Sequence, residues 1–88
     1  MIRKIYIPDN LKKKLKNKKK FPSQVREKFY WCLDMLRENP QHPSLRHKLI
    51  QGTTDVWEFS ITMNYRGVYR RKKDEAFLLV IAKHEDAF

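Results

Sequence analysis

The sequence predicts an α+β domain, in which two N-terminal helices pack on one face of a mainly antiparallel sheet of three or four strands. Apolar residues recur at helical spacing in the first half of the chain, whereas the second half holds consecutive segments with the composition of strands. The 88 residues, 41% of them hydrophobic, suffice for one packed core but not for two. We therefore expect a single domain over residues 1–88 with the element order β-α-α-β-β-β.

The N-terminal segment predicts a short strand followed by a cationic helix. Residues 2–7 are rich in β-prone side chains and end at Pro8, after which Asp9 or Asn10 can cap a helix. Residues 11–20 contain seven lysines and two leucines four positions apart, which predicts a helix with one thin apolar stripe. We expect the lysines of this helix to face water or a partner.

A second helix and a long connection follow. Pro22 should break the first helix, and Ser23 is a suitable N-cap for the next one. Apolar side chains recur at helical spacing over residues 25–36, before Asn39-Pro40 ends the helix. The connection over residues 41–54 is expected to be irregular overall.

Three strands are predicted in the second half of the chain. Residues 56–62 alternate apolar and polar side chains, the period-two pattern of a half-buried strand. Residues 65–71 predict the next strand, and a polar turn over residues 71–75 leads to a third at residues 76–83. This last strand contains an uninterrupted apolar run, so we expect it to be buried.

The charge of the chain indicates a polyanionic partner. Twenty Lys and Arg residues stand against ten Asp and Glu, which gives a formal net charge of +10. Such an excess is typical of proteins that bind nucleic acid or an acidic protein, although it can also serve only solubility. The single Cys32, the lack of a signal peptide and the lack of an apolar run of membrane-spanning length favour a cytoplasmic protein without a membrane partner.

The histidines are the candidates for chemistry on that partner. RNA cleavage needs a 2′-hydroxyl deprotonated and a leaving oxygen protonated, and histidine serves both transfers because its pKa lies near neutrality. His84 follows the last predicted strand, and His47 lies in a segment that must turn back toward the sheet. His42 is expected in an exposed turn. For any single histidine, a structural role is the commoner outcome.

A metal or a cofactor is not expected. A structural zinc site needs four ligands and a catalytic one at least three, and neither Cys-x-x-Cys nor His-Glu-x-x-His spacing is present. With only two glycines, the chain also lacks a glycine-rich phosphate loop.

Arg66 and Phe88 complete the set of candidate residues. Arg66 lies among apolar strand residues, so its guanidinium should either pair with Glu58 on the preceding strand or bind phosphate, and a carboxylate that orients the guanidinium would allow both. Phe88 can stack on a nucleobase, or it can simply pack against the core.

Several motifs in the second half follow one another in a characteristic order. They are His47-Lys48-Leu49, Gly52, Trp57-Glu58-Phe59, Tyr65-Arg66-Gly67-Val68-Tyr69 and the segment from Leu78 to His84. In order and spacing they resemble the RelE/ParE superfamily of bacterial type II toxins, with most similarity to the ribosome-dependent mRNA interferases of the YafQ and YoeB kind. The helical spacing of the first half also fits, so that the resemblance covers the entire chain.

The resemblance implies a toxin that cuts mRNA on the ribosome by 2′-hydroxyl attack without a metal, and that a cognate antitoxin neutralises. It implies a proton-transfer role for His84, a base-positioning role for Phe88, and a counterpart role for His47. By the same resemblance Arg66 contacts the scissile phosphate, and Lys48 and Lys83 are weaker candidates that supply charge. The Lys12–Lys20 helix would then bind ribosomal RNA.

The chain departs from the YafQ pattern at two positions, and two other functions stay open. Ser60 and Asn64 stand where YafQ-like members carry a histidine and an aspartate, so the chemistry is expected to be slower or divided differently. A ParE-like toxin that inhibits gyrase would share the fold without the nuclease. A noncatalytic domain that binds RNA or an antitoxin would need only the charge.

Overall fold

The predicted fold class is confirmed by the structure, a computed structural model that describes residues 2–83. His84 and Phe88, the predicted proton-transfer and base-stacking residues, lie outside the described residues. In chain order the elements are β1 (Lys4–Tyr6), α1 (Asp9–Lys16), α2 (Ser23–Glu38), the 3-10 helix η1 (Pro43–Leu45), β2 (Lys48–Leu49), β3 (Val56–Ser60), β4 (Tyr65–Lys72) and β5 (Glu75–Lys83).

The strands form one sheet in the order β1-β5-β4-β3-β2. Strand β1 runs parallel to β5, and all other neighbouring strands are antiparallel. The sheet therefore has five strands, where three or four were predicted. The additional strand is β2, whose two exposed residues, Lys48 and Leu49, pair with Glu58 and Trp57 at the edge of the sheet. A strand this short has no periodic pattern that a sequence could reveal.

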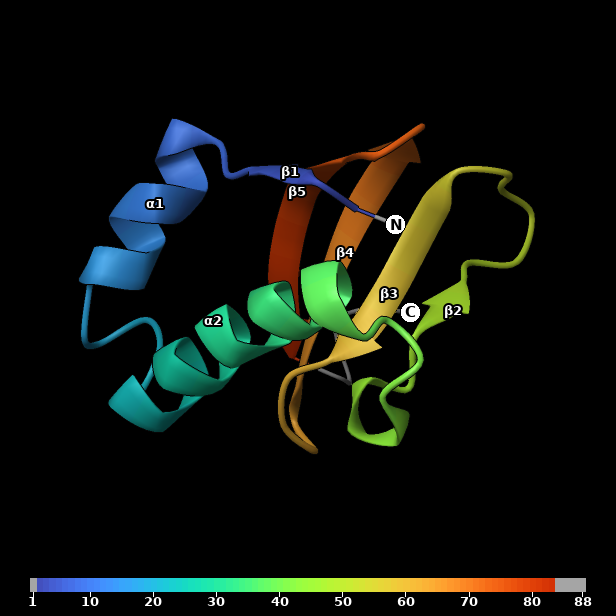
Figure 1. Cartoon of the computed structure of the whole chain (residues 1–88). Helices are drawn as coiled ribbons and strands as arrows, with labels where there is room; N and C mark the ends of the chain where they lie inside the picture. Colours follow the sequence, from blue (N-terminus) through green and yellow to red (C-terminus); the bar gives the residue numbers. More distant parts are fainter. Residues whose placement is uncertain (1, 84–88) are drawn as a thin grey trace.

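Both helices pack on the same face of the sheet, as expected (Figure 1). The apolar stripe predicted for α1 is buried through Leu11 and Leu15, and the apolar side of α2 is buried around Phe29 and Cys32. These side chains meet Phe59 and others from the sheet in one continuous core.

The ends of the helices differ from the predictions. Helix α1 ends at Lys16 rather than at residue 20, because Asn17 is extended and its side chain accepts a hydrogen bond from the Lys19 N–H at 2.9 Å. The predicted Lys12–Lys20 helix is therefore wrong in its second half. At the start of α2, Pro22 occupies the N-cap position and Ser23 is the first helical residue, without a side-chain cap.

A β-bulge in β5 changes which residues of this strand face the core. Val68 pairs with Val80 but Tyr69 pairs with Leu78, so Leu79 is an extra residue in the register. Leu79 and Val80 are consequently both exposed, at 46% and 41%, while Leu78 faces the core at 2% exposure. The expectation that the whole apolar run would be buried was wrong for these two positions.

The close approach of Phe59 to Gly67 holds β3 against β4 on the helix-covered face. These two residues are paired across the strands, and Phe59 is completely buried. A Cβ atom at Gly67 would overlap the Phe59 ring. Glycine is therefore required at this position by the space that the ring occupies.

Gly67→Ala should destabilise the fold, because the new methyl group would overlap the ring of the fully buried Phe59. We expect a loss of about 1–3 kcal/mol in the free energy of unfolding, measured by urea denaturation. Lys72→Ala, at an exposed position of the same strand, is the control and should change it by less than about 0.5 kcal/mol. Phe59→Leu should partly rescue Gly67→Ala, since a smaller side chain leaves room for the methyl group; strictly additive losses would contradict this account.

Candidate functional site

A buried carboxylate and two cations connect three strands on the face of the sheet opposite to the helices. Glu58 of β3 is 2% exposed. Its Oε1 atom lies 3.0 Å from Lys48 Nζ of β2 and 3.9 Å from Arg66 Nη1 of β4. The partnership of Arg66 with Glu58 that the sequence predicted is therefore present.

The strand register explains this arrangement. Lys48 is the direct cross-strand partner of Glu58, whereas Arg66 is the partner of Ser60 and so lies diagonally next to Glu58. Long side chains on one face can meet at both distances. The alternation in β3 puts Glu58 and Ser60 on this face and Phe59 in the core, and thus decides where the charges gather.

A hollow of about 460 Å³ lies beside Arg66, where β3 ends and β4 begins. Its lining carries three cations, three hydroxyl groups and no carboxylate: Lys28, Ser44, Arg46, Ser60, Ile61, Thr62, Met63 and Arg66. The Arg66 side chain is only 14% exposed, so it forms part of the wall of the hollow. Positive charge and hydroxyl donors, with Glu58 beside Arg66 as the neighbouring carboxylate, make this hollow a candidate anion site.

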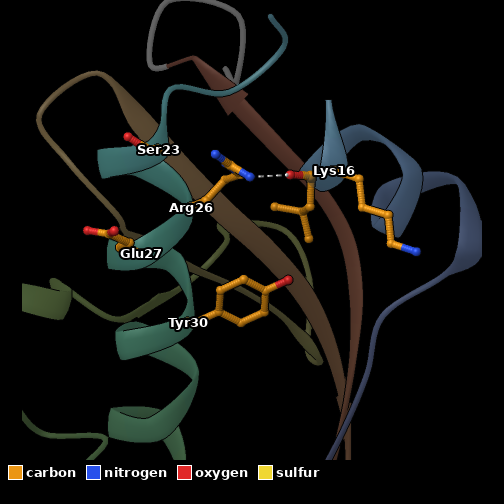
Figure 2. Close-up of a pocket in the computed structure, with 6 residues that line it drawn as sticks. Lys16, Ser23, Arg26, Glu27 and Tyr30 are labelled. Atoms are coloured by element: carbon orange, nitrogen blue, oxygen red, sulfur yellow. Dashed lines mark hydrogen bonds between the residues drawn. The ribbon is translucent and has the colours of Figure 1, made fainter. Parts of the chain in front are cut away.

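A second hollow, of about 300 Å³, lies between α1 and α2 and has a different character (Figure 2). Arg26 Nη1 donates a hydrogen bond of 3.4 Å to the carbonyl of Leu15 in the last turn of α1, which joins the two helices. Lys16 and Glu27 both line it, so its charges are mixed. We assign a structural role to Arg26.

His47 packs against aromatic residues that belong to the helix-covered side of the sheet. Its ring centroid lies 4.8 Å from that of Trp57 and 5.7 Å from that of Tyr69. Its Nε2 atom is 2.6 Å from the Tyr69 hydroxyl, and the ring also makes a hydrogen bond to the backbone of Pro40. Because these contacts face away from the Glu58 carboxylate, the structure does not bring His47 together with Arg66.

The protonation of His47 follows from these contacts. Burial raises the pKa of the Tyr69 phenol, which therefore keeps its proton at neutral pH. Burial also lowers the pKa of His47, and the Arg71 charge acts in the same direction, so the neutral imidazole is favoured. A neutral ring can donate to the Pro40 carbonyl from Nδ1 and accept from the Tyr69 hydroxyl at Nε2.

The other predicted residues are placed as follows. Lys48 contacts Glu58 as described, with its side chain 67% exposed. Lys83 is exposed at the end of β5 and pairs with Tyr65, whereas its neighbour Ala82 pairs with Arg66. Lys83 and Arg66 therefore point to opposite faces of the sheet.

Sequence reasoning did not single out Lys28, Ser44, Arg46 or Thr62. These residues come from α2, η1 and the turn after β3, and no spacing within the sequence connects them. The one local signal for any of these four residues was the position of Arg46, which directly precedes the candidate histidine His47.

Residues 2–83 lack two further kinds of feature. Within them, no three His, Cys, Asp or Glu side chains gather in a way that could hold a metal ion. In the same range, no helix has the length and apolar character needed to cross a membrane.

Known structures share this fold although the sequence itself matches no protein-family model and no curated protein. The RelE–RelB complex from the archaeon Pyrococcus horikoshii OT3 matches with a TM-score of 0.73 at 20% identity, over 99% of this chain and 100% of that chain. A YoeB/ParE toxin from Agrobacterium tumefaciens matches with a TM-score of 0.72 at 15% identity, over 93% and 99%. A copper-bound mutant toxin from Helicobacter pylori matches with a TM-score of 0.72 at 23% identity, over 100% of both chains.

This chain has the RelE/ParE toxin fold. The resemblance indicated by the sequence motifs is thereby confirmed at the level of the fold. In this RelE-like fold the Glu58 carboxylate and the hollow beside Arg66 lie where β3 and β4 meet, outside the apolar core.

The partly buried His47 predicts a specific acid sensitivity. Its pKa in the folded state is below the ordinary 6.5, so below about pH 6.5 the unfolded chain binds a proton that the folded chain does not, and stability is lost as the pH falls. The melting temperature of wild type should therefore drop more between pH 7.5 and pH 5 than that of His47→Asn. NMR titration of the His47 ring should give a midpoint below 6.5. A midpoint above 6.5 would refute the burial argument.

Proposed function

We propose that this protein is a type II toxin of the RelE/ParE superfamily, an endoribonuclease that cleaves mRNA on the ribosome and so inhibits translation. The observation that carries the proposal is the hollow beside Arg66, which gathers three hydroxyl groups and three cations, one of them the Arg66 guanidinium that lies next to the buried Glu58 carboxylate. The RelE-like fold supports it. The proposed site is of the size and charge that an RNA backbone requires.

The proposed reaction is attack of a ribose 2′-oxygen on the adjacent phosphorus. A general base takes the proton of the 2′-hydroxyl, the new bond to phosphorus forms a 2′,3′-cyclic phosphate as the bond from phosphorus to the 5′-oxygen breaks, and a general acid protonates the departing 5′-oxygen. Arg66 neutralises the charge that develops on the phosphate oxygens, a contribution that is large in a partly desolvated site. We assign the proton transfer to His84 and the stacking of a base to Phe88, as the sequence resemblance implies.

Glu58 orients Arg66 in this proposal rather than reacting itself. The carboxylate lies 3.9 Å from Nη1 of the guanidinium, and a buried carboxylate in this position can orient the group that meets a phosphate. Lys48 is the other partner of Glu58 and can add charge at the rim. A proton-transfer role for His47 and a charge role for Lys83 stay predictions, and single variants at these positions test them in the same assay.

The proposed protein partner is an antitoxin with acidic character. One of the matched structures is a RelE–RelB complex. A formal charge of +10 would attract an acidic chain over long range. The exposed lysines of α1 and of the turn that follows are proposed to contact ribosomal RNA in the absence of the antitoxin. We propose the cytoplasm, where ribosomes are present, as the location.

Cleavage should depend on Arg66 and His84. In a translating extract, with cuts mapped by primer extension, Arg66→Ala should slow mRNA cleavage by about 100–1,000-fold because the phosphate loses its neutralising charge. His84→Ala should slow it by about 100–10,000-fold because a proton transfer is lost.

Arg70→Ala is the matched control, since Arg70 lies on the same strand but pairs with Asp55 at the surface. It should cleave at nearly the wild-type rate. Wild-type protein that arrests growth while mRNA stays intact and DNA breaks accumulate would point to gyrase inhibition instead. Full cleavage by both Arg66→Ala and His84→Ala would refute the proposed site.

A further inference from the structure

Two of the cations in the hollow have no carboxylate partner among the residues that the structure describes. No carboxylate within residues 2–83 forms an ion pair with Lys28 or Arg46, whereas Arg66 has Glu58 beside it. Both residues line the same hollow, which has no acidic side chain in its wall. The like charges of Lys28 and Arg46 repel each other, so an anion between them would relieve a repulsion that the fold leaves in place.

Lys28 is held in position without losing its charge. Its Nζ atom lies 3.7 Å from the centroid of the Trp31 ring, one turn further along α2. A cation–π contact orients an ammonium group but leaves its hydrogen atoms able to donate to another ligand. The ammonium is thus positioned before any ligand arrives.

Arg46 occupies its place in an unfavourable backbone conformation. It lies directly after η1 with φ 45° and ψ 44°, the left-handed region that glycine and asparagine tolerate and arginine does not favour. Backbone strain of this kind is found most often at functional sites, where the binding role of a side chain offsets the cost of its backbone conformation. The hydroxyl of Thr62 lies in the same wall and accepts a hydrogen bond from the Asn64 N–H at 3.3 Å, so its own proton can be donated to a ligand.

The volume of the hollow exceeds the need of one phosphate group. At about 460 Å³ it falls in the range of sites, about 300–1,000 Å³, that hold ligands of many atoms. Consecutive phosphates of a single RNA strand carry one charge each, and Arg66 on one side of the hollow can neutralise only one of them.

We infer that Lys28 and Arg46 form a second phosphate subsite for the single-stranded RNA substrate, which binds the backbone phosphate next to the one at Arg66. This inference rests on the proposed function for the identity of the ligand. It assigns to α2 and η1 a part in positioning the strand, so that the phosphate at Arg66 is the one presented for attack.

The experiment measures binding without cleavage. The probe is a fluorescent hexanucleotide of RNA with 2′-O-methyl groups, which lacks the attacking hydroxyl, and anisotropy gives its Kd over a series of KCl concentrations. Lys28→Gln and Arg46→Asn should each weaken binding about tenfold, as expected for a lost charge-assisted hydrogen bond. The double variant should also reduce the slope of log Kd against log salt by about 0.7, the value for one phosphate of a single strand. Each single variant should reduce the slope by less than this, because the remaining cation still contacts the same phosphate.

The chain offers a matched control for each variant. Lys73 is the other basic residue with positive φ, 54°, and it lies in the turn at the opposite end of β4 from the hollow. Arg46→Asn and Lys73→Asn should both raise the melting temperature by about 4 °C or more, because asparagine relieves the strain. Only Arg46→Asn should weaken RNA binding. Lys72→Gln is the corresponding control for Lys28→Gln.

Two results would overturn the subsite. One is a Kd and a salt slope for Arg46→Asn and Lys28→Gln that equal those of Lys73→Asn and Lys72→Gln; the other is no binding of the probe by wild type. Cleavage of unmodified mRNA by wild type, assayed separately, reports on the nuclease. If wild type cleaves mRNA but the variants bind the probe as their controls do, the subsite is wrong and the nuclease stands. If wild type does not cleave mRNA but the variants change the salt slope, the subsite stands and the nuclease is wrong.

Discussion

The buried carboxylate of Glu58 is the group on which the arrangement of cations at this site depends. It lies in the middle strand of three, and its partners Lys48 and Arg66 come from the strands on either side. A buried charge without partners costs several kcal/mol, so the fold that contains Glu58 must also hold these two cations close to it. Such groups add little net stability compared with apolar side chains, and their effect is to select one geometry. The geometry selected here places a guanidinium, 14% exposed, beside the carboxylate and in the wall of a hollow.

The same sheet has to form a core on one face and a polar site on the other, and two local features make this possible. In β3 the strict alternation sends Trp57 and Phe59 to the helices and Glu58 to the opposite face. In β5 the apolar run has no alternation of its own, and the bulge at Leu79 shifts the register so that Leu78 and Ile81 still reach the core. The exposed Leu79 and Val80 are a consequence of that shift. Without the bulge, the alternation of the strand would put Leu78 and Ile81 on opposite faces of the sheet, so that only one of them could reach the core.

Sequence reasoning succeeded where a property repeats along the chain and failed where it depends on packing between distant segments. The helices, the alternation in β3 and the partnership of Glu58 with Arg66 follow from period and parity, which a sequence displays directly. Strand β2 has two residues and is defined only by its pairing with β3. The end of α1 depends on a single side-chain hydrogen bond at Asn17, which competes with continuation of the helix.

The hollow brings Lys28 of α2 to Arg46 and Thr62, and their proximity arises from the way α2 lies across the sheet. The position of His47 in the sequence predicted an active-site residue, but it could not reveal that Tyr69 and Trp57 contact its ring.

The cations of this protein fall into two groups with different physical effects. Lysines on α1 and in the following turn are exposed and surrounded by water, so their attraction for a polyanion is long-range and is screened within about 10 Å at 0.1 M salt. Arg66 and Lys28 are instead held by Glu58 and by the Trp31 ring, and they act over the length of a hydrogen bond. Exposed charges of the first kind accelerate encounter and do not discriminate between anions, whereas fixed donors of the second kind can distinguish a phosphodiester from a carboxylate by their placement. In the proposed function, an acidic antitoxin would therefore compete for the exposed lysines by charge alone. To prevent the proposed cleavage it would only have to keep RNA away from the hollow, and it would not need to reproduce the geometry of phosphate within it.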